Sequence, residues 1–307
     1  MAKGKVRIVV DSSTCLELEQ AEALGITVVP LHVVLQGRSY RDMVDLRPTD
    51  FYRTLRQENV HATTSAPSVG EYVEAYRAAA ADVVCLTISA KLSSMHQAAT
   101  AAERILCEDE MVHRPSPRIR VIDSGTAAGG LRLLALAAAA AAAAGADLEE
   151  VTRVVESVKP RVEMYGALET VEYLARSGRV PEVVAAVNSV LHVKPVLRLS
   201  EGSGILLQLA RTSQGVQRAL LHVLNRRLRR KVSDQGRELV CTVFHADALA
   251  AAEVLMDNIG QRYPAADVEL SEFTPVLGSH SGPGTIGLAF YIKPGQDPAS
   301  PSGSSRR

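Results

Sequence analysis

The stretch Val6–Ser13, VRIVVDSS, decides the fold class, because a nearly continuous apolar run ends there in an acidic and hydroxyl-bearing turn. The same order recurs at residues 82–89 and 119–124, which end in Ser and in Asp-Ser. Apolar runs without polar alternation are typical of strands that are buried on both faces. Helical patterns lie between these runs, so the first half is predicted to be an α/β structure with a parallel sheet.

The segments between the apolar runs complete this half. Residues 67–81 and 94–106 have helical patterns, and residues 26–35 form a further β-branched run that is expected to be a strand. The most membrane-like segment, Leu131–Ala144, has 14 residues and is mostly Ala, whereas a membrane span needs about 20. We expect it to be a packed internal helix, with no stable membrane insertion.

The order of elements changes after Lys159-Pro160. Strand patterns occur at 205–209, 238–244, 268–273 and 286–292, with helical patterns at 213–232 and 248–263. The sequence therefore predicts an α/β protein of two domains. Residues 1–160 would form a three-layer α/β/α domain with a parallel sheet, and residues 161–294 a two-layer α/β domain with a mixed sheet. The Pro-, Gly- and Ser-rich residues 295–307 are expected to be a disordered tail.

Composition argues against several classes of function. The 34 basic residues balance the 34 acidic ones, and aromatic residues make up 4% with no Trp, which disfavours binding to nucleic acid. The four cysteines have no CxxC spacing, so we expect reduced thiols in a cytoplasmic protein, with neither disulfides nor a metal site. No other cofactor is expected, and the N-terminus lacks the apolar region of a signal peptide.

Polar residues at the ends of the predicted strands and helices suggest a ligand site. Ligands of open α/β sheets bind outside the carboxyl ends of the strands, although Ser and Asp there can equally be helix caps. Thr63-Thr64-Ser65 and Ser93-Ser94 are each expected to begin a helix, and helix N-termini with hydroxyl groups bind anions. A site rich in hydrogen-bond donors suits a carboxylate or a phosphate.

The segment Gly278–Gly287, GSHSGPGTIG, contains a formal GxGxxG pattern. A strand pattern follows it instead of a helix, which argues against a dinucleotide site and favours a turn that lets backbone amides approach a ligand. His280 is expected in a loop, where it either bonds the loop or points at an anion. A nucleophile elbow needs Ser at its centre, and His280 stands there, which argues against a serine hydrolase.

A basic run falls on the helix expected at residues 213–232. Its members are Arg218, Arg226, Arg227, Arg229, Arg230 and Lys231. Such a run is either a solvated face or a docking surface for an acidic partner.

Taken in order, the motifs of this chain resemble the DegV family of bacterial fatty-acid-binding proteins. The likeness spans residues 6–292, and the final motif is the most specific. The matching pieces are Asp11-Ser12-Ser13, Thr64–Ser68, Ile88–Ser93, Val121–Ser124, Leu174–Arg179, Lys194–Leu197, His245–Ala248 and Gly278–Gly287.

The resemblance implies a non-catalytic lipid carrier with two α/β domains. One long-chain fatty acid would lie in a tunnel with its carboxylate at the domain junction, to be presented to a partner fatty acid kinase that makes an acyl phosphate. By position, Thr64, Ser93 and His280 would hold the carboxylate, with His280 able to be protonated. Arg179 matches an arginine of the head-group side or of the kinase contact. The rim nearby is expected to comprise Ser12, Ser13, Ser65, Ser94, Ser279, Gly284 and Thr285.

The chain departs from the family pattern beside this site. Ser94 replaces a usual Gly, Met95-His96 replaces a Thr-Tyr type pair, Ala66 stands where Gln is frequent, and Ser177 replaces a Gly. Two alternatives to a fatty-acid carrier stay open on the residues alone. One is a carrier of another amphiphile, such as an isoprenoid, and the other is an enzyme with His280 as its general base.

Overall fold

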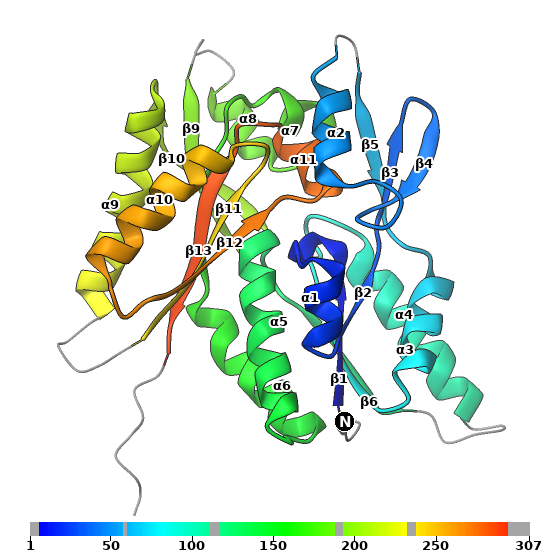
Figure 1. Cartoon of the computed structure of the whole chain (residues 1–307). Helices are drawn as coiled ribbons and strands as arrows, with labels where there is room; N and C mark the ends of the chain where they lie inside the picture. Colours follow the sequence, from blue (N-terminus) through cyan, green and yellow to red (C-terminus); the bar gives the residue numbers. More distant parts are fainter. Residues whose placement is uncertain (1–5, 58–59, 111–116, 188–192, 232–237, 294–307) are drawn as a thin grey trace, which may run out of the picture.

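The computed structural model describes residues 6–57, 60–110, 117–187, 193–231 and 238–293. Within those ranges the strands form three sheets (Figure 1). One is four-stranded and parallel with the order β2-β1-β6-β7, one is six-stranded and mixed with the order β10-β9-β8-β13-β11-β12, and one is three-stranded and antiparallel with the order β4-β3-β5.

The parallel sheet consists of β1 (Val6–Asp11), β2 (Ile26–Val29), β6 (Asp82–Thr87) and β7 (Ile119–Asp123). Helices α3 (Val69–Ala79) and α4 (Met95–Glu110) cover one face, and α5 (Ala128–Ala143) and α6 (Leu148–Val158) the other. Alternate residues divide between the faces, since Val9 packs with the first pair of helices and Ile8 with the second. The predicted three-layer arrangement is confirmed.

Two local predictions for this half were wrong. The run 26–35 is not one strand: after β2 the chain breaks at Pro30, which lacks an N–H for the ladder, and β3 (His32–Leu35) joins the antiparallel sheet with β4 (Arg38–Arg41) and β5 (Ala62–Ser65). Thr63-Thr64-Ser65 does not begin a helix, because these residues belong to β5. Helix α3 begins later, where Ser68 and Glu71 form a capping box.

The mixed sheet consists of β8 (Glu163–Ala167), β9 (Lys194–Ser200), β10 (Ser203–Ala210), β11 (Leu239–His245), β12 (Asp267–Glu272) and β13 (Ile286–Ile292). Only the pair β11–β12 is parallel. Helices α9 (Ser213–Lys231) and α10 (Leu249–Arg262) pack on one face.

Helix α5 packs between the parallel and the mixed sheet, which explains its small side chains. It contacts β1 and β6 on one side and β11 and β13 on the other (Figure 1). A Cβ at Gly129 would lie 3.1 Å from both Phe244 and Ala289 of the mixed sheet. The expectation of a packed internal helix is confirmed, and the apolar core is continuous across both halves.

Short elements complete the chain and carry much of the site. They are η1 (Ser12–Thr14), α1 (Leu18–Ala23), α2 (Pro48–Leu55), η2 (Lys159–Arg161), α7 (Glu172–Ser177), α8 (Pro181–Val187) and α11 (Pro275–Ser281). The parallel sheet ends before residue 160 and the mixed sheet begins after it; the division into two domains there stays a prediction. The expected tail, 295–307, lies outside the described residues.

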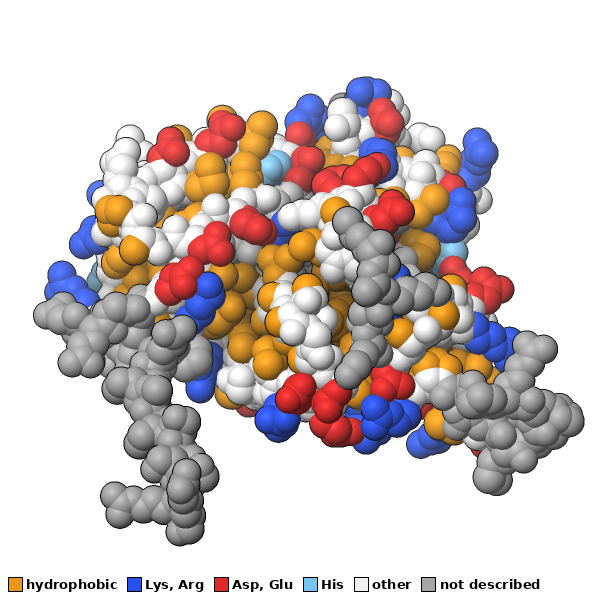
Figure 2. Space-filling model, turned by 60° about the horizontal axis from the view of Figure 1, so that its bottom comes forward, with side chains coloured by type: hydrophobic (Ala, Val, Ile, Leu, Met, Phe, Trp, Pro, Cys, Tyr) orange, Lys and Arg blue, Asp and Glu red, His pale blue; other side chains and the backbone are white. Residues whose placement is uncertain are grey.

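Among the described helices, none is both long and apolar enough to cross a membrane. Acidic and basic side chains are interspersed over the face that Figure 2 presents, in keeping with the overall charge balance.

Candidate functional site

A cavity of about 380 Å³ lies where the two halves of the chain meet. That volume falls in the range of small-molecule sites, about 300–1,000 Å³. Its wall is mostly apolar and comes from both halves. The apolar lining includes Leu31, Ile88, Met95, Met164, Leu197, Leu199, Phe244, Phe273, Val276 and Leu277.

The polar residues of this cavity include all three expected carboxylate ligands. Thr64 comes from β5, Ser93 from the segment between β6 and α4, and His280 from α11. Thr64 Oγ1 lies 2.9 Å from His280 Nε2, so a residue of the first half bonds directly to one of the second. The fold thus brings Thr64, Ser93 and His280 to one cavity.

His280 does not lie in a loop as expected, but in the last turn of α11. Two glycines let bulky rings pack against this helix. A Cβ at Gly278 would lie 2.5 Å from the hydroxyl of Tyr52, and one at Gly282 would lie 2.2 Å from the ring of Tyr173. The glycines around His280 therefore allow the close packing that holds the helix in place. Gly282 also allows the turn after the helix, because its φ is 74°.

The electrostatics of His280 differ from the expectation that it could be protonated. Burial, and the positive charge of Arg179 nearby, lower the pKa of His280 to about 4, so the ring is neutral at pH 7. Its Nδ1 atom is buried and has no hydrogen-bond partner among the described residues. Leaving such a polar atom unpaired costs about 1–3 kcal/mol, a cost that a hydrogen bond to a ligand would offset.

Arg179 is half-buried, and it lines the cavity and also two adjoining pockets. Its guanidinium donates to the carbonyl oxygen of Ser177 at 2.6 Å. Within the described residues it makes no ion pair, so most of its five N–H groups are available to a ligand or partner.

The expected rim divides into two groups. Ser65, Ser94 and Thr285 line the cavity, and Ser279 lines an adjoining pocket of about 290 Å³. Gly284 lines none of these spaces; its N–H donates to Ala246 O at 2.8 Å.

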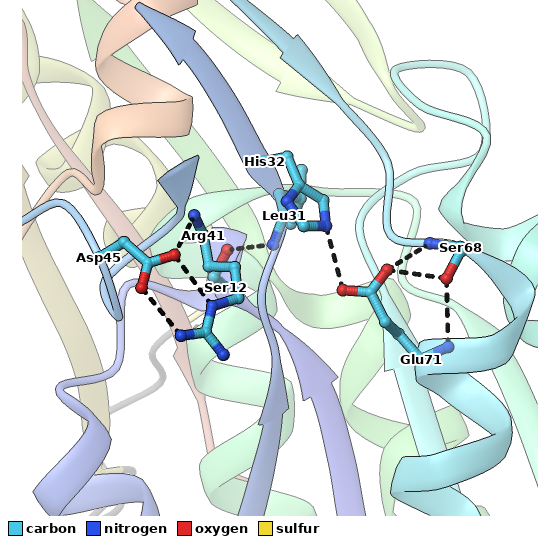
Figure 3. Close-up of polar contacts among 7 residues, drawn as sticks. All are labelled: Ser12, Leu31, His32, Arg41, Asp45, Ser68 and Glu71. Atoms are coloured by element: carbon cyan, nitrogen blue, oxygen red, sulfur yellow. Dashed lines mark hydrogen bonds and ion pairs between the residues drawn. The ribbon is translucent and has the colours of Figure 1, made fainter. Parts of the chain in front are cut away.

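Ser12 and Ser13 do not reach the cavity. Ser12 Oγ donates to Asp42 at 2.6 Å and accepts from the N–H of Leu31 (Figure 3), while the hydroxyl of Ser13 donates to Asp11. At this strand end the capping interpretation is correct, because Asp11 caps the short helix η1.

The antiparallel sheet positions Thr64. Strand β3 pairs with β5 so that Val33 lies opposite Thr64. His32 of the same strand contacts Glu71 at 3.0 Å, and Glu71 also accepts from the N–H of Ser68 (Figure 3). The turn after β4 is closed by Arg41, which donates to Asp45 once through its backbone N–H and twice through its guanidinium group. Polar contacts thus hold this small sheet to helix α3, and with it the backbone that carries Thr64.

Two carboxyl groups near the site, Asp11 and Asp42, are buried, and the sequence singles out only Asp11. Asp42 accepts from Ser12 Oγ and, at 3.2 Å, from the N–H of Val276 in α11, the helix that carries His280. Burial raises the pKa of Asp11 to about 6 and that of Asp42 to about 7. The sequence gives no indication of the contact between Asp42 and Val276, because these residues are 234 positions apart.

The basic run on α9 lies apart from the cavity and has mixed roles. Arg227 donates to Tyr165 and pairs with Glu163 at 2.9 Å, so it ties α9 to the mixed sheet. Arg218, Arg226 and Arg229 are exposed, and the side chains of Arg230 and Lys231 lie outside the described residues. A docking role for the run stays a hypothesis.

Comparisons with known proteins agree on one family. The model of the family described as "Uncharacterised protein, DegV family COG1307" matches residues 5–293. A DegV domain-containing protein of Halalkalibacterium halodurans is 32% identical over 293 residues, which cover 94% of this chain and 99% of the relative.

Solved structures of similar fold are described as fatty-acid-binding. A DegV family protein of Thermus thermophilus, described by its fatty acid binding, superimposes with a TM-score of 0.83 at 28% identity, covering 94% of this chain and all of the other. A stearic acid-binding protein of Eubacterium ventriosum gives 0.82 at 26% identity, covering 93% and 98%. The family match over nearly the whole length, the shared fold and the ordered motifs lead to one conclusion: this chain belongs to the DegV family.

Proposed function

We propose that this chain binds one long-chain fatty acid in the cavity, with the acyl chain along the apolar wall and the carboxylate held by Thr64, Ser93 and His280. The observation that carries the proposal is the Thr64–His280 pair in a mostly apolar cavity, where His280 Nδ1 is buried without a partner among the described residues. Fatty acid binding by the Thermus and Eubacterium relatives supports it.

The energetics suit a long acyl chain. Burial of a methylene contributes about 0.8 kcal/mol, so some 14 of them contribute roughly 11 kcal/mol before the costs of association. The carboxylate then sets the orientation, because burying it without hydrogen bonds costs several kcal/mol. An isoprenoid or another lipid acid would pack against the same apolar wall. Identifying the lipid extracted from the purified protein distinguishes these ligands from a fatty acid.

The neutral state of His280 defines how the head group is held. A carboxylate only accepts hydrogen bonds, and a neutral imidazole has one N–H. Either Thr64 donates to Nε2 while Nδ1–H donates to the ligand, or Nε2–H donates to Thr64, whose hydroxyl then donates to the ligand. Both arrangements supply one donor, and Ser93 supplies another. A carboxylate bound there would also raise the pKa of His280 towards its ordinary value.

The residues favour a carrier over an enzyme. Thr64 and His280 are spaced like a nucleophile and its base, but a base whose pKa is about 4 accepts a proton poorly at neutral pH. A catalytic histidine is also held by a third group through its other nitrogen, and among the described residues His280 Nδ1 has none. We therefore assign no catalytic role to His280.

The carrier would present the carboxylate to a partner fatty acid kinase. On that partner, a carboxylate oxygen attacks the γ-phosphorus of ATP, the bond from that phosphorus to ADP breaks, and acyl phosphate and ADP form. Arg179 lines the cavity, and its N–H groups suit a carboxylate or a phosphate of the partner complex.

The proposal is tested by titrating delipidated protein with palmitate in a calorimeter. We expect saturable binding of one palmitate per chain, with micromolar or tighter affinity. Folded protein that releases no heat and takes up no palmitate or oleate would refute it.

A further inference from the structure

Helix α11 receives its N-terminal cap from the other half of the chain. Its own N-cap residue, Thr274, makes no side-chain cap, and Pro275 at the first helical position has no N–H. The N–H of Val276, at the second position, donates to Asp42 Oδ1 at 3.2 Å. Asp42 lies directly after β4, so a residue of the first half takes the place that an N-cap side chain usually fills.

The carboxyl group of Asp42 is held in place within the first half. It is fully buried, and Ser12 Oγ donates to its Oδ2 at 2.6 Å. The N–H of Asp42 donates to the carbonyl oxygen of Leu31 at 2.8 Å, and the N–H of Leu31 donates to Ser12 Oγ (Figure 3). The next residue, Met43, is buried with φ 64°, a conformation that residues other than Gly rarely adopt. Such strain persists only where the surrounding structure holds the backbone, so Asp42 stands on a fixed part of the chain.

Val276 and His280 lie on the same side of α11. They are four positions apart, which separates them by about one helical turn, or about 6 Å along the axis, and both line the cavity. The helix has seven residues, and Tyr52 of the first half packs against it at Gly278. A shift of this short helix at Val276 therefore moves His280 with it.

We propose that Asp42 is a positioning residue for the lipid head group: it holds the N-terminus of α11 and thereby keeps His280 where it bonds Thr64 and the carboxylate. The inference rests on the proposed function, because the affinity that Asp42 would govern is that for a fatty acid. Asp42 lines neither the cavity nor the two adjoining pockets, so its effect on binding passes through α11. Hydrogen bonds of this kind need heavy-atom distances of about 2.7–3.2 Å, so a small shift of α11 weakens the bond to the ligand.

Two substitutions separate the capping contact from the rest of the side chain. Asp42→Ala removes the acceptor, whereas Asp42→Asn keeps a carbonyl oxygen for the N–H of Val276, and Asn and Asp are about equal as caps. In calorimetric titration of delipidated protein, Asp42→Ala should weaken palmitate binding roughly 3- to 30-fold, and Asp42→Asn should stay within about twofold of wild type. Asp42→Leu, which fills the space but has no acceptor, takes the place of Asp42→Ala if that variant does not fold.

Ser13→Ala is the matched control. Ser13 is buried in the same part of the first half, but its hydroxyl donates to Asp11. This substitution should lower the free energy of unfolding in urea, as Asp42→Ala does, and yet leave the affinity for palmitate unchanged. An equal loss of affinity in Ser13→Ala would overturn the proposal, because general destabilisation would then explain both results.

A double-mutant cycle with His280 tests whether Asp42 acts through that residue. His280→Ala should weaken palmitate binding, and adding Asp42→Ala to it should cost no more than about a further twofold, since the side chain to be positioned is gone. The nitrogen-15 NMR spectrum of the imidazole gives a second readout. In ligand-free protein the His280 resonances should shift in Asp42→Ala and return towards their wild-type positions in Asp42→Asn.

Three further results would overturn the proposal. The first is wild-type affinity for palmitate in Asp42→Ala or Asp42→Leu, and the second is binding by Asp42→Asn that is as weak as that by Asp42→Ala. The third is a double variant in which the separate losses from Asp42→Ala and His280→Ala multiply, with His280 resonances that Asp42→Ala leaves unchanged. Folded wild-type protein that binds no palmitate would instead refute the proposed function itself.

Discussion

Thr64 Oγ1 lies 2.9 Å from His280 Nε2, although the two residues are 216 positions apart in the chain. Thr64 is held by the small antiparallel sheet and His280 by a seven-residue helix, so their contact depends on the assembly of both halves. The Thr64–His280 contact in the cavity therefore forms only when both halves of the chain have folded.

Thr64→Ala and Ser93→Ala should each weaken palmitate binding while the fold survives. A hydrogen bond to a charged group contributes about 1.5–3 kcal/mol, which corresponds to roughly a 10- to 100-fold loss of affinity. Calorimetric titration measures it, with Ser157→Ala on the surface of α6 as the control, since the Ser157 hydroxyl bonds only its own helix. Wild-type affinity in both variants would remove these residues from the site.

Gly282→Ala should destabilise the protein and weaken palmitate binding. The new Cβ would meet the ring of Tyr173 and displace the end of α11, at a cost of about 1–3 kcal/mol beyond the backbone strain at positive φ. Gly145→Ala is the matched control, because Gly145 also has positive φ but nothing within 4 Å. Urea unfolding compares the two. Equal losses in the free energy of unfolding for Gly282→Ala and Gly145→Ala would mean that the contact with Tyr173 is unimportant.

Asp42 should make folding stability depend on pH in a defined direction. Its pKa is raised to about 7 by burial, above its ordinary value of 3.8, so the folded state binds more protons than the unfolded state between these values. The contribution is fully present below pH 4 and is lost as pH rises through 7.

The variant Asp42→Asn isolates this effect. The stability of wild type relative to Asp42→Asn should fall between pH 4 and pH 7, by an amount on the order of 1.4 kcal/mol for each step of one in pH. His280 contributes in the opposite direction, because its pKa is lowered and its contribution is lost as pH falls from about 6.5 to 4, but it is common to both proteins. If the stability difference between wild type and Asp42→Asn stays constant or grows with pH, the pKa of Asp42 is not raised.

Arg179→Ala should leave palmitate loading nearly intact and lower acyl-phosphate formation in a reconstituted assay with the cognate kinase. The reason is that Arg179 also lines the two adjoining pockets and hydrogen-bonds only to Ser177 within the described residues. Arg176→Ala is a suitable control, since Arg176 contacts His61 and Glu172 and lines only the adjoining pocket. Loss of loading would place Arg179 in the lipid site, and unchanged phosphorylation would leave the basic run on α9 as the better docking candidate.

The sequence was informative wherever the pattern is local. VRIVVDSS and its two counterparts identified the parallel sheet, because burial on both faces leaves an uninterrupted apolar run. The short helices α7, α8 and α11 have six or seven residues, too few for a helical period to stand out, so His280 was assigned to a loop. The hydroxyl residues of strand β5 resemble helix caps, so the sequence predicts a helix start there, whereas Ser68 and Glu71 form the cap three residues later.

The site was predictable only in part for the same reason. Thr64, Ser93 and His280 were identified through the family motifs, and the fold does bring them to one cavity. Ser12 and Ser13 end a strand as the site residues do, but their hydroxyls bond Asp42 and Asp11, a choice that depends on tertiary contacts. The neutral state of His280 follows from burial, which no spacing in the sequence reports.

Native mass spectrometry of the purified chain, before and after addition of palmitate, tests the central claim most directly. The account predicts a mass increase of one fatty acid per chain, identified by extraction and fragmentation, and its loss on Thr64→Ala with Ser93→Ala. A folded chain that stays at its bare mass with palmitate and with oleate, or that carries a lipid without a carboxylate, would contradict it.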